Sequence, residues 1–406
     1  MTDAQYEIRP ARDDEMDRVH FLVAYSFTGD RTLEGRAKMR HLEEMARPQV
    51  LIDGGEIVAS LRVYPFRMLV NGAPVDMGGV SAVSCLPEHR RKGHVGRMLV
   101  GALAEMRDRG QPLSALYTPH PDLYRRYGWM TAAANLKYTW NPKHVRPYIP
   151  ERPPGRAERV TEEDWPLIAA VYEQFIRGRT GPIERTEARW KEAFFRDIYD
   201  DSRAINDVAV WRNEAGEATG YVSYRPRQKG DRSVVEVKEL VSLSGEAQTG
   251  LLRYILSHDL NDEITWYGPV EDGFSFTVDN PQLMKREFVE DLMLRVVDLP
   301  AAVAARPAGA GTPDGAFTLE LADAACPWNS GTWRVTAEDG RLEAAKADGA
   351  GQVAMTAATF GAVYDGYLRT SDAVRTGLAQ SADTDAMAHA DRAFASDSRP
   401  LCYDFF

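Results

Sequence analysis

The stretch Cys85–Leu99, CLPEHRRKGHVGRML, lies where a predicted strand gives way to a predicted helix. The strand covers Val80–Cys85, and from Val95 onward apolar residues recur at the i, i+3, i+4, i+7 spacing of a helix packed on a sheet. A basic turn that contains a glycine joins the two. Such a turn directs backbone N–H groups toward one point, beside the positive end of a helix dipole. It is therefore predicted to hold an anionic phosphate group.

The residues of this turn favour the same kind of ligand. Arg90, Arg91 and Lys92 supply positive charge, and Gly93 lets the backbone come close to a ligand. The stretch matches neither the Walker pattern nor the G-x-G-x-x-G dinucleotide pattern, so neither of those phosphate sites is indicated. The alternative interpretation is a basic surface turn that only begins a helix.

Length, charge and cysteine content limit the class of protein. The chain has 406 residues, enough for two to four domains, and 44% of them are hydrophobic, enough for packed cores. A net charge of −11 argues against a nucleic acid partner. It suits a cationic ligand, but the favoured interpretation of the overall charge is ordinary solubility. Cys85, Cys326 and Cys402 lie far apart and predict neither a metal site nor a disulfide framework. Without a signal peptide or a membrane-spanning run, the sequence predicts a soluble, cytoplasmic protein with no membrane partner.

The order of predicted elements divides the chain into three domains. Residues 1–150 are expected to form an α/β domain around the phosphate turn, with the proline-rich segment 141–156 as a linker. Residues 151–297 are expected to form a second α/β domain, and residues 298–406 an α+β domain. The main strands are predicted at 50–52, 56–65, 73–85, 113–117, 207–212, 218–225, 234–242, 317–321, 332–337 and 341–345.

The second α/β domain lacks an equivalent basic turn. After its strand over 234–242 the chain continues as Ser242–Gln248, without an arginine cluster. Glu246 stands where a pyrophosphate would bind and would repel it. We therefore expect this domain to have lost the phosphate ligand.

The basic turn of the first domain resembles the acetyl-CoA loop of the GNAT acetyltransferases. The motif of that family is Arg/Gln-x-x-Gly-x-Gly/Ala, and this sequence matches it at Arg90 and Gly93. It departs at Val95, where the family has Gly or Ala, and Gly96 follows one place later. A valine N–H donates as well as a glycine N–H, so the turn keeps its donors.

A tyrosine cluster, Tyr124–Trp129, follows the strand over 113–117. In a GNAT fold the helix at this place lies beside the thioester. A phenol, with a pKa of about 10, can hand its proton to a departing thiolate whose pKa is about 8.5. We predict Tyr124 to be this acid, with Tyr127 as the competing candidate. The alternative is that one tyrosine is a core residue and the other a surface aromatic.

The C-terminus is aromatic and apolar, ending Pro400–Phe406. Chain ends are usually polar and frayed, so this one is expected to pack inside the protein. A packed end carries its α-carboxylate with it, and desolvation raises the basicity of that group. It is then able to take a proton from an amine. The alternative interpretation is a terminal hydrophobic anchor.

These motifs together resemble the Eis (enhanced intracellular survival) acetyltransferases, a GNAT family, over essentially the whole chain. The resemblance is carried by His89–Gly93, Leu123–Trp129, Val297–Ala302, Asp391–Phe394 and Asp404–Phe406, in this order. It implies two fused GNAT domains, the second degenerate, followed by a domain like sterol carrier protein. It also implies a homohexamer that moves acetyl from acetyl-CoA to amines, notably those of aminoglycosides and protein lysines, without a metal.

The resemblance also assigns residues to roles. The family's tyrosine acid falls on Tyr124, and its terminal carboxylate base falls on Phe406. The positions whose backbone holds coenzyme A fall on Val83, Ser84, Cys85, Arg90, Arg91, Lys92, Gly93, His94, Val95 and Gly96. The expected reaction is direct attack of a primary amine of a small cationic molecule on the thioester. Cys85 is interpreted as a packing residue, since no His/Asp arrangement that would activate it is evident.

The segment before Tyr124 departs from the family. Many relatives have Ser-Glu-Gly-Gly there, whereas this chain has Pro119-His120-Pro121-Asp122. A glutamate is thereby lost from the pocket side, which puts aminoglycoside use in question. His120 is either an auxiliary base or a loop histidine bonded to the backbone.

Two other functions stay open. One is a dedicated protein lysine acetyltransferase, which predicts activity on peptides and none on polyamines. The other is a binding protein that senses acetyl-CoA in the first domain and holds a lipid in the third.

Overall fold

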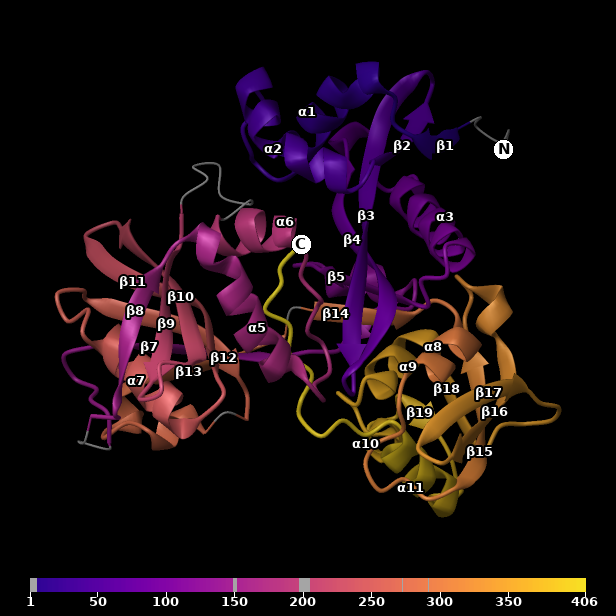
Figure 1. The fold of residues 1–406 in the computed structure, drawn as a ribbon. Helices are drawn as coiled ribbons and strands as arrows, with labels where there is room; N and C mark the ends of the chain where they lie inside the picture. The colour runs from indigo at the N-terminus through magenta and orange to yellow at the C-terminus, as the bar shows by residue number, and fades with distance from the viewer. Residues whose placement is uncertain (1–5, 149–151, 197–204, 272, 291) are drawn as a thin grey trace. The chain divides into compact units, whose positions relative to one another are not determined.

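A computed structural model describes residues 6–148, 152–196, 205–271, 273–290 and 292–406 (Figure 1). The chain forms two compact units. Unit 1 comprises residues 1–133, 178–184 and 291–406, and unit 2 comprises residues 134–177 and 185–290. Within the described ranges, no helix is long and apolar enough to cross a membrane.

A seven-stranded sheet is the centre of the N-terminal part of unit 1, with the order β1-β2-β3-β4-β5-β14-β6. Its neighbours pair antiparallel except β4 and β5, which run parallel. Its strands are β1 (Glu7–Pro10), β2 (Gln49–Asp53), β3 (Glu56–Val70), β4 (Ala73–Cys85), β5 (Leu113–Tyr117), β6 (Met130–Thr131) and β14 (Leu292–Val296). The helices in this part are η1 (Asp13–Glu15), α1 (Met16–Ser26), α2 (Leu33–Met45), η2 (Pro87–His89), α3 (His94–Asp108) and α4 (Pro121–Arg125).

Helix α3 packs its apolar face on β3 and β4, as its periodicity predicts. The buried residues of that face include Met98, Leu99, Ala102, Leu103 and Met106. The β3–β4 hairpin turns at Asn71-Gly72, where both residues have positive φ, 48° and 78°. Two consecutive residues of positive φ are the backbone of a tight hairpin turn, so the predicted turn is confirmed.

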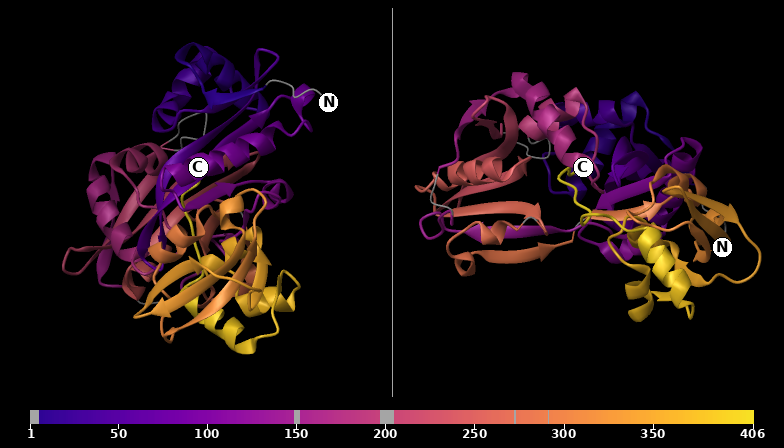
Figure 2. Two further views of the ribbon diagram at one scale, coloured as in Figure 1. Left: turned by 90° about the vertical axis from the view of Figure 1, so that its right-hand side faces the viewer. Right: turned by 60° about the horizontal axis from the view of Figure 1, so that its bottom comes forward.

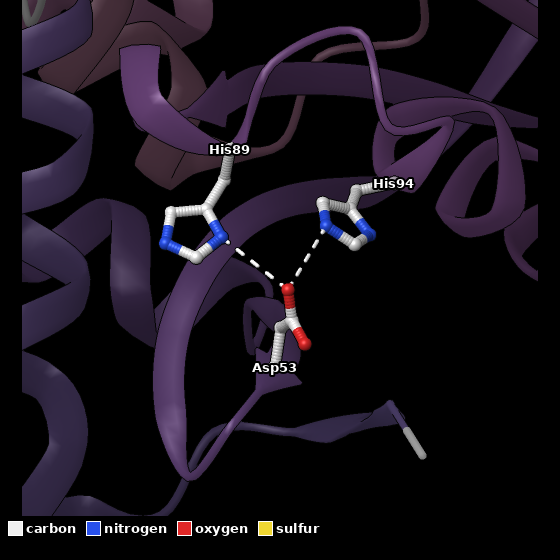
Figure 3. A group of neighbouring side chains, drawn as sticks. All are labelled: Asp53, His89 and His94. Atoms are coloured by element: carbon white, nitrogen blue, oxygen red, sulfur yellow. Dashed lines mark ion pairs between the residues drawn. The ribbon is translucent and has the colours of Figure 1, made fainter. Parts of the chain in front are cut away.

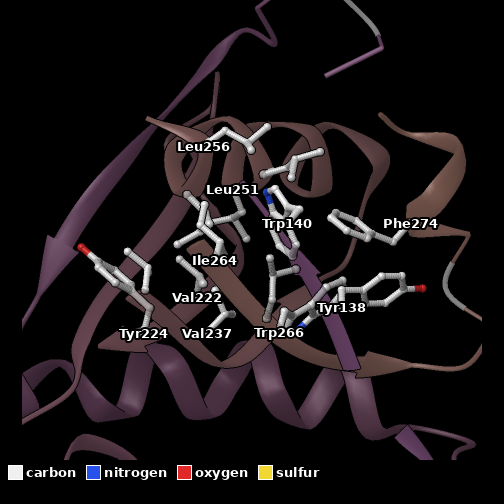
Figure 4. Close-up of a cluster of buried hydrophobic side chains, with 14 of the residues drawn as sticks. Tyr138, Trp140, Val222, Tyr224, Val237, Leu251, Leu256, Ile264, Trp266 and Phe274 are labelled. Atoms are coloured by element: carbon white, nitrogen blue, oxygen red, sulfur yellow. The ribbon is translucent and has the colours of Figure 1, made fainter. Parts of the chain in front are cut away.

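Unit 2 is built on a second seven-stranded sheet, with the order β13-β7-β12-β11-β10-β9-β8. Its strands are β7 (Asn135–Trp140), β8 (Gly155–Val160), β9 (Asp207–Asn213), β10 (Ala218–Lys229), β11 (Arg232–Ser242), β12 (Glu263–Pro269) and β13 (Lys285–Val289). Its helices are η3 (Glu162–Asp164), α5 (Trp165–Ile176), α6 (Glu187–Arg189), η4 (Trp190–Phe195), α7 (Gly245–Leu256), η5 (Phe274–Phe276) and η6 (Pro281–Leu283). The core between α7 and the sheet is aromatic at one end, where the rings of Trp266 and Phe274 meet edge to face at 4.8 Å (Figure 4).

One strand of each sheet comes from the far side of a predicted domain boundary. β14 pairs with β5 from Leu292↔Tyr117 to Val296↔Leu113, so it completes the first sheet although it follows all of unit 2 in sequence. β7 precedes the proline-rich segment, yet it lies between β13 and β12 in the second sheet. The sheets therefore do not divide at residues 150 and 297, because pairing follows register and not chain order.

The C-terminal part of unit 1 has the predicted α+β composition. Its five-stranded sheet has the order β17-β16-β15-β18-β19. The strands are β15 (Gly315–Ala322), β16 (Gly331–Glu338), β17 (Arg341–Lys346), β18 (Val353–Thr356) and β19 (Ala379–Gln380). The helices are α8 (Leu299–Ala305), η7 (Pro327–Asn329), α9 (Ala357–Tyr364), α10 (Thr370–Arg375) and α11 (Thr384–Ala393). Helix α11 packs against β15 (Figure 2), and α9 is buried along its whole length and packs against β14.

Candidate active site

Strands β4 and β5 of unit 1 separate part of the way along their length. They pair at three positions only, from Met77↔Leu113 to Gly79↔Ala115. β4 then continues to Cys85 and β5 to Tyr117 without further pairing between them. The two strands therefore form a fork, and their facing backbone groups beyond Gly79 are able to bond an extended ligand.

A β-bulge in β4 lies just beyond the fork. Ser60 of β3 pairs with Ser84 and Arg62 pairs with Ser81, so one residue of β3 faces two of β4. Ala82, one of those two, has a φ of 51°. A bulge bends its strand, and a non-glycine residue at positive φ is uncommon, which together mark a specialised backbone. The bend accompanies the departure of β4 from β5 and leads into the predicted ligand positions Val83, Ser84 and Cys85.

The basic turn that follows has the backbone of an anion site. Arg91 and Gly93 have φ of 64° and 82°, and Gly93 is the N-cap residue of α3. The cap has no side-chain hydrogen bond, and the first intrahelical bond is from Arg97 N–H to the Gly93 carbonyl at 3.1 Å. The N–H groups of His94, Val95 and Gly96 belong to the first helical turn, whose donors have no partner within the helix. They are therefore placed to bind a phosphate.

The side chains of the turn have different roles. Arg90 donates from Nε to the Cys85 carbonyl at 3.0 Å, so its guanidinium ties the turn to the end of β4. Arg97 donates from Nη1 to the Lys92 carbonyl at 2.7 Å and steadies the other end. Arg91 and Lys92 are exposed and leave their charge at the surface of the turn. Cys85 is buried, and desolvation raises the pKa of its thiol, which keeps it protonated and fits a packing role.

Tyr124 lies in the short helix α4 and is buried, with 8% of its surface exposed. Its ring packs edge to face on Trp129, with the ring centroids 6.2 Å apart. Burial raises the pKa of its phenol to about 12, although a hydrogen bond with Thr118 lowers it in part. The phenol is therefore neutral near pH 7 and holds a proton that it is able to donate.

Tyr127, the competing candidate, is placed differently. A Cβ added to Gly96 would come 1.9 Å from the Tyr127 hydroxyl oxygen, so that hydroxyl lies against the first turn of α3. The glycine is required there because its missing side chain makes room for the phenol. The hydroxyl of Tyr127 thus lies beside the anion turn, whereas Tyr124 is enclosed with Trp129.

A buried ion pair supports the Tyr124–Trp129 turn, and sequence reasoning did not identify it. Arg295 of β14 donates to both carboxylate oxygens of Asp323 at 2.8 Å, and both side chains are almost fully buried. The same guanidinium donates to the Tyr127 carbonyl and lies over the Trp129 ring at 5.6 Å. Arg295 therefore holds the loop that follows Tyr124.

The C-terminal Phe406 is buried at the fork. Its ring lies 5.0 Å from that of Phe66 on β3 and 5.3 Å from that of Tyr117 on β5, centroid to centroid. A Cβ added to Gly79, in the last β4–β5 pair, would come 2.9 Å from Phe406 Cε2. The expected packed terminus is thus present, and its ring fills the space beside the point where the strands separate.

Residues 178–184 of unit 1 hold the tail that leads to Phe406. This segment is bonded to β3: the Leu69 N–H donates to the Pro182 carbonyl, and the Gly181 N–H donates to the Leu69 carbonyl, both at 2.8 Å. Leu401 N–H then donates to the Thr180 carbonyl at 3.0 Å. Backbone hydrogen bonds therefore connect β3 to residues 178–184 and residues 178–184 to the tail that leads to Phe406.

Two histidines named in the sequence analysis, His94 and His120, have different surroundings. The His94 ring is buried, and its Nε2 lies 3.4 Å from Asp53 Oδ2. Only the backbone N–H of His94 is therefore counted among the donors of the anion turn. His120 is exposed at the start of α4, and its backbone N–H donates to Thr118 Oγ1 at 2.9 Å.

The equivalent place in unit 2 differs from the anion turn. Helix α7 begins after Ser244, whose Oγ accepts a hydrogen bond from Ala247 N–H at 3.1 Å. The Glu246 carboxylate accepts from Trp211 Nε1 at 3.0 Å. A side chain therefore caps this helix and a carboxylate stands in its first turn, in keeping with the expected loss of a phosphate ligand.

Comparison with protein families divides the chain into three matched segments. Residues 7–132 match one acetyltransferase (GNAT) domain model, residues 181–296 match another, and residues 299–403 match a sterol carrier protein domain. The two fused GNAT domains and the third domain predicted from the sequence are thereby confirmed.

Similar proteins and structures cover most or nearly all of the chain. It is 29% identical to an uncharacterized N-acetyltransferase of Streptomyces coelicolor over 83% of each chain. It is 25% identical to N-acetyltransferase Eis of Mycobacterium tuberculosis, over 95% of this chain and 96% of the relative. Its fold matches a probable N-acyltransferase of Enterococcus faecalis with a TM-score of 0.89, at 22% identity over 99% and 100% of the two chains. It also matches Eis1 of Mycobacterium abscessus with a TM-score of 0.81, at 22% identity over 99% and 100%.

Proposed function

Because the chain is an Eis-like N-acetyltransferase of the GNAT family, we propose that unit 1 moves an acetyl group from acetyl-CoA directly to a primary amine of a small cationic molecule. The single observation that carries this proposal is the fork between β4 and β5, with the anion turn at one end and Phe406 at the other.

The cosubstrate fits the fork by its chemistry. Acetyl-CoA has a pyrophosphate, which suits the N–H groups of His94, Val95 and Gly96 together with the charges of Arg91 and Lys92. Its amide-containing tail is extended and suits the facing backbone of β4 beyond Gly79, over Val83, Ser84 and Cys85. The thioester then lies toward the end of the fork where the ring of Phe406 packs.

Tyr124 is the proposed general acid. As the amine nitrogen bonds to the acetyl carbon, the carbon–sulfur bond breaks and the sulfur leaves as a thiolate. The neutral phenol gives its proton to that sulfur, and the tyrosinate regains a proton from solvent after product leaves. With a pKa of about 12 the phenol is protonated at every physiological pH, so it holds the proton that this step requires.

The α-carboxylate of Phe406 is the proposed base. It takes the proton that the amine nitrogen loses on forming the amide, either directly or through one water. Packing of the Phe406 ring among Phe66, Gly79 and Tyr117 supports this role, because it fixes the residue that bears the carboxylate. The homohexamer implied by the resemblance and the cytoplasmic location predicted from the sequence stay predictions.

The test is thiol release from acetyl-CoA over a panel of aminoglycosides, polyamines, arylamines and lysine peptides. Wild type is compared with Tyr124→Phe, with a chain lacking Phe406, and with a chain extended by one glycine after Phe406. The extended chain keeps the Phe406 ring but moves the carboxylate away. Tyr127→Phe is the matched control for the phenol.

We expect turnover of one amine class by wild type and its loss in the three test variants, with acetyl-CoA binding retained in each. Full activity of the extended chain would contradict the carboxylate's role. Activity confined to lysine peptides would replace the small-molecule acceptor by a protein.

A further inference from the structure

Three potential metal ligands converge beneath the basic turn of unit 1 (Figure 3). His89 Nδ1 and His94 Nε2 each lie 3.4 Å from the same carboxylate oxygen, Asp53 Oδ2. One ligand atom from each residue lies within 4.8 Å of the other two. In Figure 3 both imidazole rings turn an edge toward this carboxylate.

Different elements bring these side chains together. Asp53 is the last residue of β2, His89 ends the short helix η2, and His94 is the first residue of α3. The Leu86 N–H donates to the Val58 carbonyl at 3.0 Å, which holds the start of η2 on β3 beside the Asp53 turn. The cluster is therefore anchored to the sheet and does not depend on loop contacts alone.

The nitrogens of this cluster lack the hydrogen bonds expected of buried polar atoms. Among the residues that the structure describes, none forms a hydrogen bond with the buried His89 Nδ1 or with either ring nitrogen of His94, and His94 is only 6% exposed. Buried polar nitrogens without a partner are unfavourable, so native proteins usually satisfy them. The 3.4 Å separations are longer than ordinary N–H···O hydrogen bonds, which are about 2.7–3.2 Å.

The two 3.4 Å nitrogen–oxygen separations fit a shared metal ion better than they fit direct hydrogen bonds. Metal–ligand bonds of about 2.0 Å in a tetrahedral zinc site place neighbouring ligand atoms about 3.3 Å apart. Both nitrogen–oxygen separations in the cluster, 3.4 Å, are close to that edge length. Two imidazoles and one carboxylate suit zinc and its first-row neighbours, whereas magnesium and calcium prefer oxygen ligands.

We propose that Asp53, His89 and His94 bind one divalent first-row transition metal ion of the zinc or cobalt class. Asp53 Oδ2, His89 Nδ1 and His94 Nε2 are its three protein ligands, and water completes the coordination. The side chains of Asp53 and His89 are 23% and 18% exposed, which gives the ion a path from solvent. Once bound, the ion ties the β2–β3 turn to the beginning of α3.

The test is binding of Zn²⁺ alone to the full chain, freed of any purification tag and treated with chelator. Titration calorimetry with ZnCl₂ gives the affinity and stoichiometry, and the visible absorption of the Co²⁺-loaded protein reports the coordination geometry. Asp53→Asn and His94→Gln remove one ligand each. His144→Gln is the matched control, because His144 is exposed in unit 2 and belongs to no such cluster in the part of the chain that the structure describes.

We expect one strong site per chain, weakened more than about tenfold in Asp53→Asn and His94→Gln and unchanged in His144→Gln. Zn²⁺ should also raise the melting temperature of wild type but not of the two ligand variants, whose cooperative melting without metal shows that they are folded. Absence of a strong site in wild type, or equal affinity in both folded ligand variants, would overturn the proposal. Neither readout uses acetyl transfer, so the site stands or fails independently of the proposed reaction.

Discussion

The ring of Phe406 lies against Gly79, in the last pair of residues that joins β4 to β5. A Cβ built on Gly79 would approach Phe406 Cε2 to 2.9 Å and two Phe66 ring carbons to 2.7 Å. The final residue of the chain thus occupies space that only a glycine leaves free. Its position is set by the same strand that carries the bulge and the anion turn.

Gly79→Ala should therefore displace Phe406 and impair turnover. We expect a loss of stability of about 1–3 kcal/mol from overpacking, and a fall in kcat larger than that in acetyl-CoA affinity. The control is Gly101→Ala in α3, where an added Cβ meets nothing within 4 Å and alanine favours the helix. Equal kcat in wild type and Gly79→Ala would show that the ring position does not matter for the reaction.

Tyr124→Phe should lower kcat by about 10²–10⁴-fold if the phenol is the acid. The raised pKa of about 12 sets the pH dependence, since the neutral phenol persists until the pH approaches that value. Activity limited by this group should thus stay level through pH 10 and decline only as the pH rises toward 12. A pH–rate profile of kcat, with Tyr127→Phe beside it, checks this, and an alkaline decline centred near pH 8 would have to come from another group.

Gly93→Ala should weaken acetyl-CoA binding because alanine is strained at a φ of 82°. The strain is about 1–2 kcal/mol, which the turn relieves by losing the geometry of its N–H groups. Gly216→Ala in unit 2, at φ 84° with no atom within 4 Å of the added Cβ, is the control for strain alone. Calorimetric titration with acetyl-CoA should show about tenfold weaker binding in Gly93→Ala and wild-type binding in the control. Similar affinities in all three would argue against the turn as the phosphate site.

Arg295→Met should destabilise unit 1 strongly, because it leaves the Asp323 carboxylate buried without its partner. The expected loss is about 3–5 kcal/mol in urea-induced unfolding. Replacing both residues, as Arg295→Met with Asp323→Leu, should recover part of that loss, since no unpaired charge then remains. Acetyl transfer should stay impaired in the double variant, because the loop after Tyr124 has still lost its hydrogen bond at the Tyr127 carbonyl. Full activity in the stable double variant would remove Arg295 from any positioning role.

Much of the fold was predictable because its signals are local. The periodicity of α3, the Asn71-Gly72 turn and the strand over 73–85 are each encoded within a dozen or so neighbouring residues, and the structure confirms them. The basic turn was equally visible, since its charges and its glycine are contiguous.

Other features depend on partners distant in the sequence. Nothing within 292–296 shows that this strand pairs with β5, about 180 residues earlier, so the boundary predicted at 297 could not anticipate it. Arg295 lies in an otherwise apolar strand, and its structural role becomes evident only from its ion pair with Asp323. Asp53 is separated from His89 and His94 by the whole β3–β4 hairpin, and no motif links them. Their distances require the folded chain.

The placement of β14 also orders events during synthesis of the chain. The sheet that carries the fork can be completed only after residue 296 has left the ribosome, by which time all of unit 2 has been synthesised. Unit 2, whose strands all lie between residues 135 and 289, is complete earlier. The N-terminal domain is thus the first to be translated and among the last to finish folding, and contacts over so long a sequence separation form slowly. Until then the edge of β5 stands open to pairing with other chains, which exposes this strand to misassembly.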